Sequence, residues 1–126
     1  MKRLIIFAMI LIADIDILAN AIAGEAPYCP QEHQVAVAAV ILNRVADERF
    51  PGTVAGVVGQ EGQYSPSYLT GTAPEECYEA AQKALDGEHT VPPDVVYQAN
   101  FPQGEVWWES TVDTGYWRST TYFCKG

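Results

Sequence analysis

Residues 31–46 read QEHQVAVAAVILNRVA, and this stretch decides the fold. From Val35 to Leu42 the stretch is hydrophobic on every side of a helix, which is the pattern of a helix buried in the centre of a protein. Its many valines could also form a strand, but a length of about four turns and the polar residues at both ends favour a helix. Pro30 is well placed to start it. The sequence therefore predicts a central helix from about Gln31 to Ala46.

The elements predicted after this helix change in character along the chain. Glycine, serine and aromatic residues become frequent beyond Pro51, and the last third of the chain is rich in residues that favour strands. The predicted fold class is α+β, with a helical N-terminal part and a short antiparallel sheet toward the C-terminus. Its later elements are a short helix over 53–58, a loop over 59–67, a helix opened by a capping box between Thr72 and Glu75 and ended by Gly87, and strands over 95–99, 105–109 and 119–123.

Length and charge narrow the possible partners. A chain of 126 residues has room for one domain with a modest core. It carries 7 Lys+Arg against 16 Asp+Glu, a net charge of -9, and it has no basic stripe that could neutralise phosphates. We therefore expect no nucleic acid as a partner. We also expect a monomer that uses no cofactor.

The first thirteen residues resemble a secretory signal. Lys2 and Arg3 precede the apolar run from Leu4 to Ala13, whose ten residues are too few to span a bilayer. The alternative is that this run is the first core helix. A cut at the small-x-small sequence 21–23 would strip away the helix that leads into Glu25. We expect a secreted or cell-envelope protein whose folded domain covers residues 14–126.

The cysteines and histidines predict no metal site. Cys29, Cys77 and Cys124 allow one disulfide, and the sequence does not choose among the three pairings. No Cys-x-x-Cys occurs, and neither His33 nor His89 lies at a zinc-ligand interval from a cysteine. Both histidines are expected to be solvated, in a loop or at a helix start.

One carboxylate stands out at the end of the first predicted helix. Asp14 can cap that helix and Gly24 can stop it, which puts Glu25 just past the helix end and before a loop constrained by Pro27. Cleaving a glycosidic bond requires a carboxylic acid that stays protonated near the leaving oxygen. A glutamate held at the wall of a cleft can supply that acid, although a glutamate after a glycine is usually an ordinary solvated residue.

Glu25 opens a longer pattern that extends over most of the chain. In order, its parts are Gly24-Glu25-Ala26, Glu32, Gln34 to Val40, Leu42 to Val45, Arg49-Phe50-Pro51, Thr53-Val54, Gly56-Val57-Val58, Gly62 to Pro66, Glu75 to Ala81, Tyr97, Asn100 and Trp107-Trp108. Together they resemble the cell wall hydrolases related to the spore-cortex-lytic enzyme SleB, over roughly Ile17 to Trp108. A match of this length is far more specific than any single motif.

The resemblance implies a lysozyme-like catalytic domain that cleaves peptidoglycan glycan strands. In such enzymes, which are similar to lytic transglycosylases, the glutamate after glycine acts as acid and then as base, and this role falls on Glu25. The acid protonates the oxygen between N-acetylmuramic acid and N-acetylglucosamine, and the muramic acid's own 6-hydroxyl attacks the anomeric carbon. If water attacked instead, as in a hydrolytic muramidase, a second carboxylate would be needed, and Glu32 and Glu61 are the candidates.

Other residues are candidates for substrate binding. Gln63 and Tyr64 lie in a loop suited to hydrogen-bond an N-acetyl group, and Trp107 can stack on a sugar face. Because adjacent strand residues point to opposite faces, at most one of Trp107 and Trp108 is expected to line the cleft, while the other joins the core. Tyr97 and Asn100 fit either cleft or packing roles. Asn43 and Arg44 are expected to bond backbone groups or an acid.

Two departures from the family pattern keep alternatives open. Pro27-Tyr28-Cys29 stands where the family usually has arginine-glycine-glutamate, and the family's closing histidine is replaced around Thr120 or Thr121. A binding-only module of the same fold is therefore the first alternative. The second is a cysteine peptidase that pairs Cys29 with His33 or His89, although nothing near Cys29 would lower the pKa of its thiol.

Overall fold

A computed structural model describes residues 12–60 and 62–126. Within these residues, four α-helices and one 3-10 helix come first, followed by a three-stranded sheet, so the predicted α+β order is confirmed. The predicted signal-like run falls almost entirely outside the described residues, as does Glu61. The elements are α2 (Ile12–Glu25), α3 (Gln31–Ala46), α4 (Val54–Val58), η1 (Pro66–Leu69), α5 (Glu75–Leu85), β1 (Val95–Ala99), β2 (Glu105–Asp113) and β3 (Arg118–Lys125).

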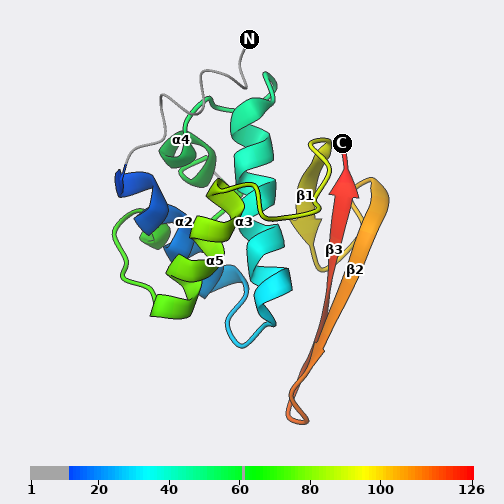
Figure 1. Ribbon diagram of the computed structural model, residues 1–126. Helices are drawn as coiled ribbons and strands as arrows, with labels where there is room; N and C mark the ends of the chain where they lie inside the picture. Colours follow the sequence, from blue (N-terminus) through cyan, green and yellow to red (C-terminus); the bar gives the residue numbers. More distant parts are fainter. Residues whose placement is uncertain (1–11, 61) are drawn as a thin grey trace.

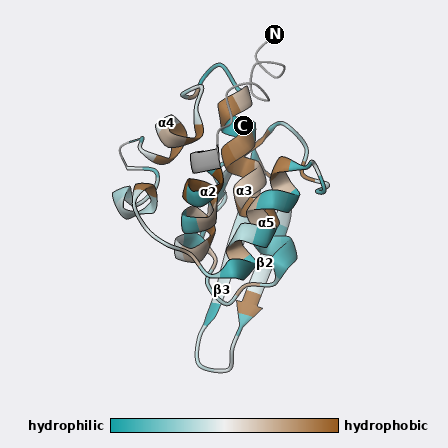
Figure 2. Ribbon diagram, turned by 60° about the vertical axis from the view of Figure 1, so that its left-hand side comes forward, coloured by the Kyte–Doolittle hydropathy of each residue, from teal (hydrophilic) through white to brown (hydrophobic). Residues whose placement is uncertain are grey.

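Helix α3 stands in the centre of the molecule (Figure 1). Every residue from His33 to Ile41 is buried, which confirms the prediction of a helix covered on all sides. Helices α2, α4 and α5 lie on one side of α3 and the sheet lies on the other. In Figure 2 hydrophobic colour concentrates on α3, while α5 and the β2–β3 hairpin are mostly hydrophilic. The core therefore forms around one helix.

Side chains at the C-terminal end of α3 tie the helix to the sheet. Asn43 Nδ2 donates to the carbonyl oxygens of Pro92 at 2.8 Å and Val95 at 2.9 Å, and Arg44 Nε donates to the carbonyl of Val96 at 2.7 Å. The expectation that these two residues bond backbone groups is confirmed. Because the acceptors lie on or just before β1, these bonds fix where the sheet begins against the helix.

The sheet is antiparallel with the strand order β1-β3-β2. Strand β2 continues to Asp113 and β3 begins at Arg118, so the hairpin between them is longer than the sequence predicted. It projects beyond the helices in Figure 1. The Phe123 side chain on β3 is fully buried and belongs to the same core as α3.

Three local predictions about helix ends are wrong. Asp14 lies within α2, which already includes Ile12, so it does not cap that helix. Helix α5 begins after Pro74, and no side chain caps it, so the capping box between Thr72 and Glu75 does not form. Glu25 is the last residue of α2 rather than a residue beyond it, because the Ala26 N–H still donates to the Ile22 carbonyl at 2.8 Å. The carboxylate is thus held by a helix and not by a loop.

His33 is also placed differently from its prediction as a solvated residue. It is 2% exposed, its Nδ1 lies 2.8 Å from Ser110 Oγ, and its ring contacts Trp108 and Phe123 edge to face. The sheet covers the first turn of α3, and Ser110 satisfies the imidazole there. Burial lowers the pKa of His33 from 6.5 to about 4.

This burial predicts a loss of stability in mild acid. The unfolded chain takes up the His33 proton below pH 6.5, whereas the folded chain resists it until about pH 4. The free energy of unfolding should therefore fall by at most about 3 kcal/mol from this group between those two pH values. Denaturant unfolding at several pH values measures the slope.

His33→Gln keeps a hydrogen-bonding side chain and should flatten that slope, whatever its effect on stability at pH 7. His89→Gln is the comparison variant and should flatten the slope less than His33→Gln, because burial also lowers the pKa of His89 but leaves that residue half-buried. An unchanged slope in His33→Gln would contradict the prediction.

Candidate active site

Glu25 is contacted by side chains from two other parts of the fold. Tyr68 on η1 donates its hydroxyl to Glu25 Oε2 at 3.1 Å, and Gln98 Nε2 on β1 donates to Oε1 over a longer 3.4 Å. Helix α2 supplies the glutamate itself. The carboxylate thus lies where the helical part of the molecule meets the sheet.

The contact with Tyr68 explains the glycine before Glu25. A Cβ atom on Gly24 would collide with the ring and hydroxyl of Tyr68. Asn20, buried one turn earlier on α2, donates from Nδ2 to the Tyr68 carbonyl at 2.9 Å and to the Gly71 carbonyl at 2.8 Å. One face of α2 therefore holds the η1 segment so that the tyrosine reaches the acid.

Electrostatic surroundings favour a protonated Glu25. Loss of solvent around the carboxylate raises its pKa, and the hydrogen bond from Tyr68 opposes part of that rise. The carboxylate still opens to solvent on its cleft side. Glu25 consequently keeps its proton at a higher pH than a free glutamate does, which is a property that a general acid needs.

Two hollows meet at Glu25. One, of about 270 Å³, is lined by Glu25, Cys29 and His33 together with the hairpin residue Trp117. The other, of about 220 Å³, is lined by Glu25, Arg44, Gln63, Tyr64 and Gln98, among others. Glu25 is the one carboxylate among the described residues that line either hollow. An extended ligand could occupy both hollows and place its central bond at this acid.

Arg44 lines the 220 Å³ hollow and contacts several of the side chains around it. The guanidinium is buried, and its carbon lies 4.9 Å from the ring centre of Phe50, 5.7 Å from that of Tyr64 and 5.8 Å from that of Tyr97. Its Nη1 donates to Gln63 Oε1 at 3.1 Å. Burial raises the pKa of Tyr64 to about 12, so this tyrosine remains a neutral hydrogen-bonding group. Gln63 and Tyr64 are thereby fixed beside Glu25.

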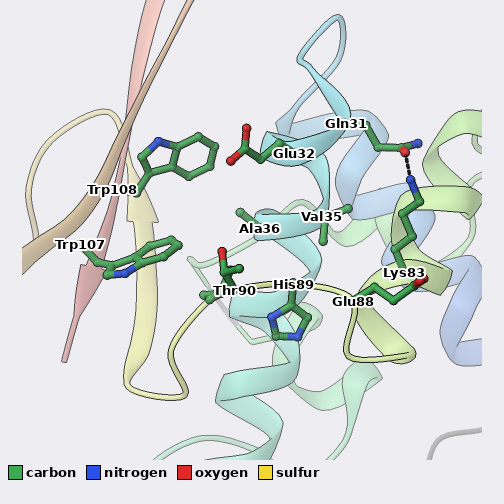
Figure 3. Close-up of a pocket in the computed structure, with 11 residues that line it drawn as sticks. Gln31, Glu32, Val35, Ala36, Lys83, Glu88, His89, Thr90, Trp107 and Trp108 are labelled. Atoms are coloured by element: carbon green, nitrogen blue, oxygen red, sulfur yellow. Dashed lines mark hydrogen bonds between the residues drawn. The ribbon is translucent and has the colours of Figure 1, made fainter.

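The structure separates the remaining candidates. Tyr97 packs on Arg44 behind the hollow, and Asn100 is exposed and lines neither hollow. Trp107 and Glu32 line a third hollow, of about 370 Å³, which shares no lining residue with the two at Glu25 (Figure 3). Of the predicted binding residues, Gln63 and Tyr64 are the ones that share a hollow with the acid.

Trp107 and Trp108 do not point to opposite faces as predicted. The pairing of β2 with β3 shifts register between Val106 and Trp108, which leaves Trp107 without a partner residue in the ladder. Such a bulge breaks the alternation of side chains along a strand. Both indoles consequently line the same third hollow, with their ring centres 6.2 Å apart.

Sequence reasoning missed Trp117, which lies in the hairpin turn just before β3 and lines a hollow with Glu25. It is 43% exposed, and its neighbour Tyr116 is 98% exposed. The signal was present: two aromatic residues follow Gly115 in a turn, where no core can bury them. The position of Trp117 beside Glu25 depended on the length of the hairpin, which the sequence underestimated.

The geometry does not favour a cysteine peptidase. Burial raises the pKa of the Cys29 thiol, which disfavours the nucleophilic thiolate. No hydrogen bond joins Cys29 to His33 or His89, all three of which the structure describes, and His33 Nδ1 bonds Ser110 instead. The three cysteines are free thiols. Within residues 12–60 and 62–126, no three His, Cys, Asp or Glu side chains gather to hold a metal ion.

The loop after Glu25 contains a strained residue. Tyr28 has a φ of 64°, in the left-handed region that glycine adopts freely, and its side chain is 80% exposed. A left-handed φ costs a residue with a Cβ atom about 1 kcal/mol.

Comparison with known proteins establishes the family. The profile of the Cell Wall Hydrolase family matches residues 29–123. This chain belongs to that family. The match begins four residues after Glu25, so the acid itself lies just outside the matched segment. The resemblance read from the sequence is confirmed.

Curated relatives of this cell wall hydrolase are spore cortex-lytic enzymes. The chain is 45% identical over 76 residues to the enzyme of Bacillus cereus, covering 57% of this chain and 27% of that protein. It is 43% identical over 76 residues to the enzyme of Bacillus subtilis, again over 57% of this chain and 23% of that protein. This chain thus spans about a quarter of the length of these relatives.

Solved structures share the fold of this cell wall hydrolase. The catalytic domain of the germination-specific lytic transglycosylase SleB from Bacillus anthracis matches with a TM-score of 0.72 and 30% identity, over 92% of this chain and 97% of that one. The catalytic domain of the Bacillus cereus SleB protein matches with a TM-score of 0.67 and 32% identity, over 90% of each chain. The predicted fold is confirmed.

Removing the Tyr68 hydroxyl should raise the pKa of Glu25 further. The hydroxyl donates to the carboxylate and so stabilises its charged form, which Tyr68→Phe cannot do. Carbon-detected NMR titration of the Glu25 carboxyl measures the pKa in both proteins. Tyr78→Phe controls for loss of a phenol elsewhere, and a lower or equal Glu25 pKa in Tyr68→Phe would refute the assignment.

Proposed function

We propose that this chain cleaves peptidoglycan glycan strands between N-acetylmuramic acid and N-acetylglucosamine, as a lytic transglycosylase. The observation that carries the proposal is the place of Glu25, a partly desolvated carboxyl at the junction of two hollows. The SleB catalytic domain that shares the fold is described as a lytic transglycosylase, which supports the same chemistry here.

In the first step Glu25 acts as general acid. A glycan strand lies across both hollows with its scissile bond at the acid, and protonated Glu25 gives its proton to the bridging oxygen as the bond to the muramic anomeric carbon breaks. Because burial raises the pKa of Glu25, the proton is held to a higher pH than on a free glutamate. Tyr68 and Gln98 hold the two carboxylate oxygens in place.

In the second step the ionised Glu25 acts as general base. It removes the proton from the 6-hydroxyl of the same muramic acid, and that oxygen bonds to the anomeric carbon to give the 1,6-anhydro ring. The proton returns to Glu25, so the acid is ready for another cycle. No second carboxylate is required, in contrast to the pair used by most glycosidases.

The two alternatives have less support. A hydrolytic muramidase needs a second carboxylate near Glu25, and Glu32 lies in the separate third hollow. Glu61 precedes Gly62, which lines the smaller hollow, but falls outside the described residues. A binding-only module would have no reason to keep a desolvated glutamate at the junction of its grooves.

Action on the cell wall supports a location outside the cytoplasm, and we propose a secreted or cell-envelope enzyme. The N-terminal signal-like order supports this proposal. Within residues 12–60 and 62–126 no helix is long and apolar enough to cross a membrane. The whole relatives are about four times longer than this chain, so the spore cortex remains one proposed target among bacterial walls.

Glu25→Gln tests the assignment directly. The parent enzyme should release 1,6-anhydromuramic ends from peptidoglycan, identified by mass spectrometry, and the variant should lose at least about a thousand-fold in rate because the amide donates no acid proton. Cys29→Ser, in the same hollow, should retain the activity. Release of reducing ends instead would show that the enzyme hydrolyses the bond. Release of new amino termini would show that it cleaves peptide bonds and is not a glycosidase.

The same variant should not be destabilised at neutral pH. A raised pKa means that the fold disfavours the ionised glutamate, so the free energy of unfolding of the parent falls as pH rises through that pKa. Glu25→Gln removes this cost. An unfolding temperature at pH 7 equal to or above that of the parent would show that the loss of activity is chemical.

Trp117 should contribute to substrate binding in the 270 Å³ hollow that it lines with Glu25. Its half-exposed indole offers an apolar face to a sugar ring beside Glu25. Trp117→Ala should lower kcat/KM on soluble glycan strands roughly five- to ten-fold. The adjacent Tyr116→Ala, which removes an aromatic ring that lines no hollow described here, should change it less than about two-fold. Equal effects would contradict this role.

A further inference from the structure

The third hollow belongs to no step of the proposed reaction. Its volume of about 370 Å³ exceeds that of either hollow at Glu25 and falls in the range of small-molecule sites. It lies between the first turns of α3, the chain around Glu88 to Val91 that leads to the sheet, and the bulged part of β2 (Figure 3). The size and position require an explanation other than catalysis.

Two indoles form one wall of this hollow. The bulge in β2 puts Trp107 and Trp108 on the same side, with their rings inclined by 71°. Trp108 is fixed from behind, because it stacks on Phe123 at 5.2 Å and meets the His33 ring at 6.1 Å. A rigid pair of indoles is a platform for the apolar face of a pyranose ring, since little side-chain freedom is lost on binding.

Polar groups face the indoles from the other side. Figure 3 shows the Glu32 carboxylate directed toward Trp108, with Thr90 and His89 below it. Burial lowers the pKa of His89, so its imidazole is neutral near pH 7 and can both donate and accept hydrogen bonds. Carboxylate, hydroxyl and imidazole groups around an apolar platform suit a ligand that carries many hydroxyl groups.

The charges in the hollow discriminate among ligands. Lys83 is engaged by Gln31, whose side-chain oxygen accepts its hydrogen bond, and the carboxylates of Glu32 and Glu88 outnumber that single cation. An anionic ligand, such as a peptide stem with free carboxylates, would be repelled. A neutral sugar would not be.

From these features we propose that the hollow of Trp107 and Trp108 is a second, non-catalytic binding site for N-acetylhexosamine residues of a glycan strand. This inference rests on the proposed function in one respect, which is that the bound polymer is the glycan strand of peptidoglycan. Because this hollow shares no lining residue with those at Glu25, one strand can occupy the reaction site while another is held here. The second contact keeps the enzyme on an insoluble wall between cuts.

The chain has three tryptophans, so their indole N–H signals report both sites separately by NMR. Glu25→Gln protein is titrated with the tetramer of N-acetylglucosamine, and the signals are assigned with single Trp→Phe variants. The Trp107 and Trp108 signals should shift saturably and should still do so after Trp117→Ala. Trp107→Ala should abolish the shift of Trp108 while the Trp117 signal responds as before.

Several results would overturn the proposal. The Trp107 and Trp108 signals could fail to shift with the sugar, or could shift with a stem peptide and not with the sugar. They could also shift in the parent protein but not in Trp117→Ala, which would mean that the sugar binds only at Trp117. Each outcome would sink the second sugar site while leaving the test of Glu25 unaffected. Conversely, loss of lytic activity together with intact indole shifts would count against the proposed reaction alone.

Binding to insoluble peptidoglycan gives an independent readout. In the Glu25→Gln background, Trp107→Ala should weaken sedimentation with the wall about three- to ten-fold, whereas Tyr116→Ala should not. In the active enzyme, Trp107→Ala should leave the rate on short soluble glycans unchanged. An unfolding temperature close to that of the parent and retention of binding by Trp107→Phe exclude misfolding, and equal wall binding by both alanine variants would refute the site.

Discussion

The burial of α3 on all sides is the constraint from which the rest of the structure follows. A helix without a polar face must be covered everywhere, and here three helices cover one side and the sheet covers the other. Two different kinds of structure therefore meet along α3. Glu25 lies at that junction, since η1 and β1 both reach its carboxylate. The covering of one apolar helix thus creates the cleft as well as the core.

The same arrangement brings a buried cation near Glu25, the proposed general acid. Arg44 and Glu25 line the same hollow, and a free guanidinium there would favour the charged carboxylate. The hydrogen bonds of Arg44 go to other groups. Arg44 donates to the Val96 carbonyl and to Gln63, and its guanidinium lies over the aromatic rings of Phe50 and Tyr64. Desolvation and Tyr68, rather than the arginine, are the influences on the pKa of Glu25.

Local signals made much of this fold predictable. Helix α3 has the predicted bounds, and β1 does too, because a long apolar run and a β-rich segment between turns are strong patterns. The burial of His33 could not be predicted, since it depends on Ser110, far along the chain, covering the helix. Trp117 was missed for a similar reason. Its place beside Glu25 follows from the length of a hairpin, and strand ends are poorly encoded.

The bulge at Trp107 makes the placement of the two indoles depend on the length of β2. One extra residue in β2 puts both indoles on one face, so deleting a single residue there would restore strict alternation and turn one indole away. The rest of β2 and the hairpin follow the bulge in the chain. After such a deletion, their pairing with β3 would shift by one residue unless the turn absorbed the change. A change of one residue in the length of β2 would therefore separate the two indoles even in a chain that kept both tryptophans.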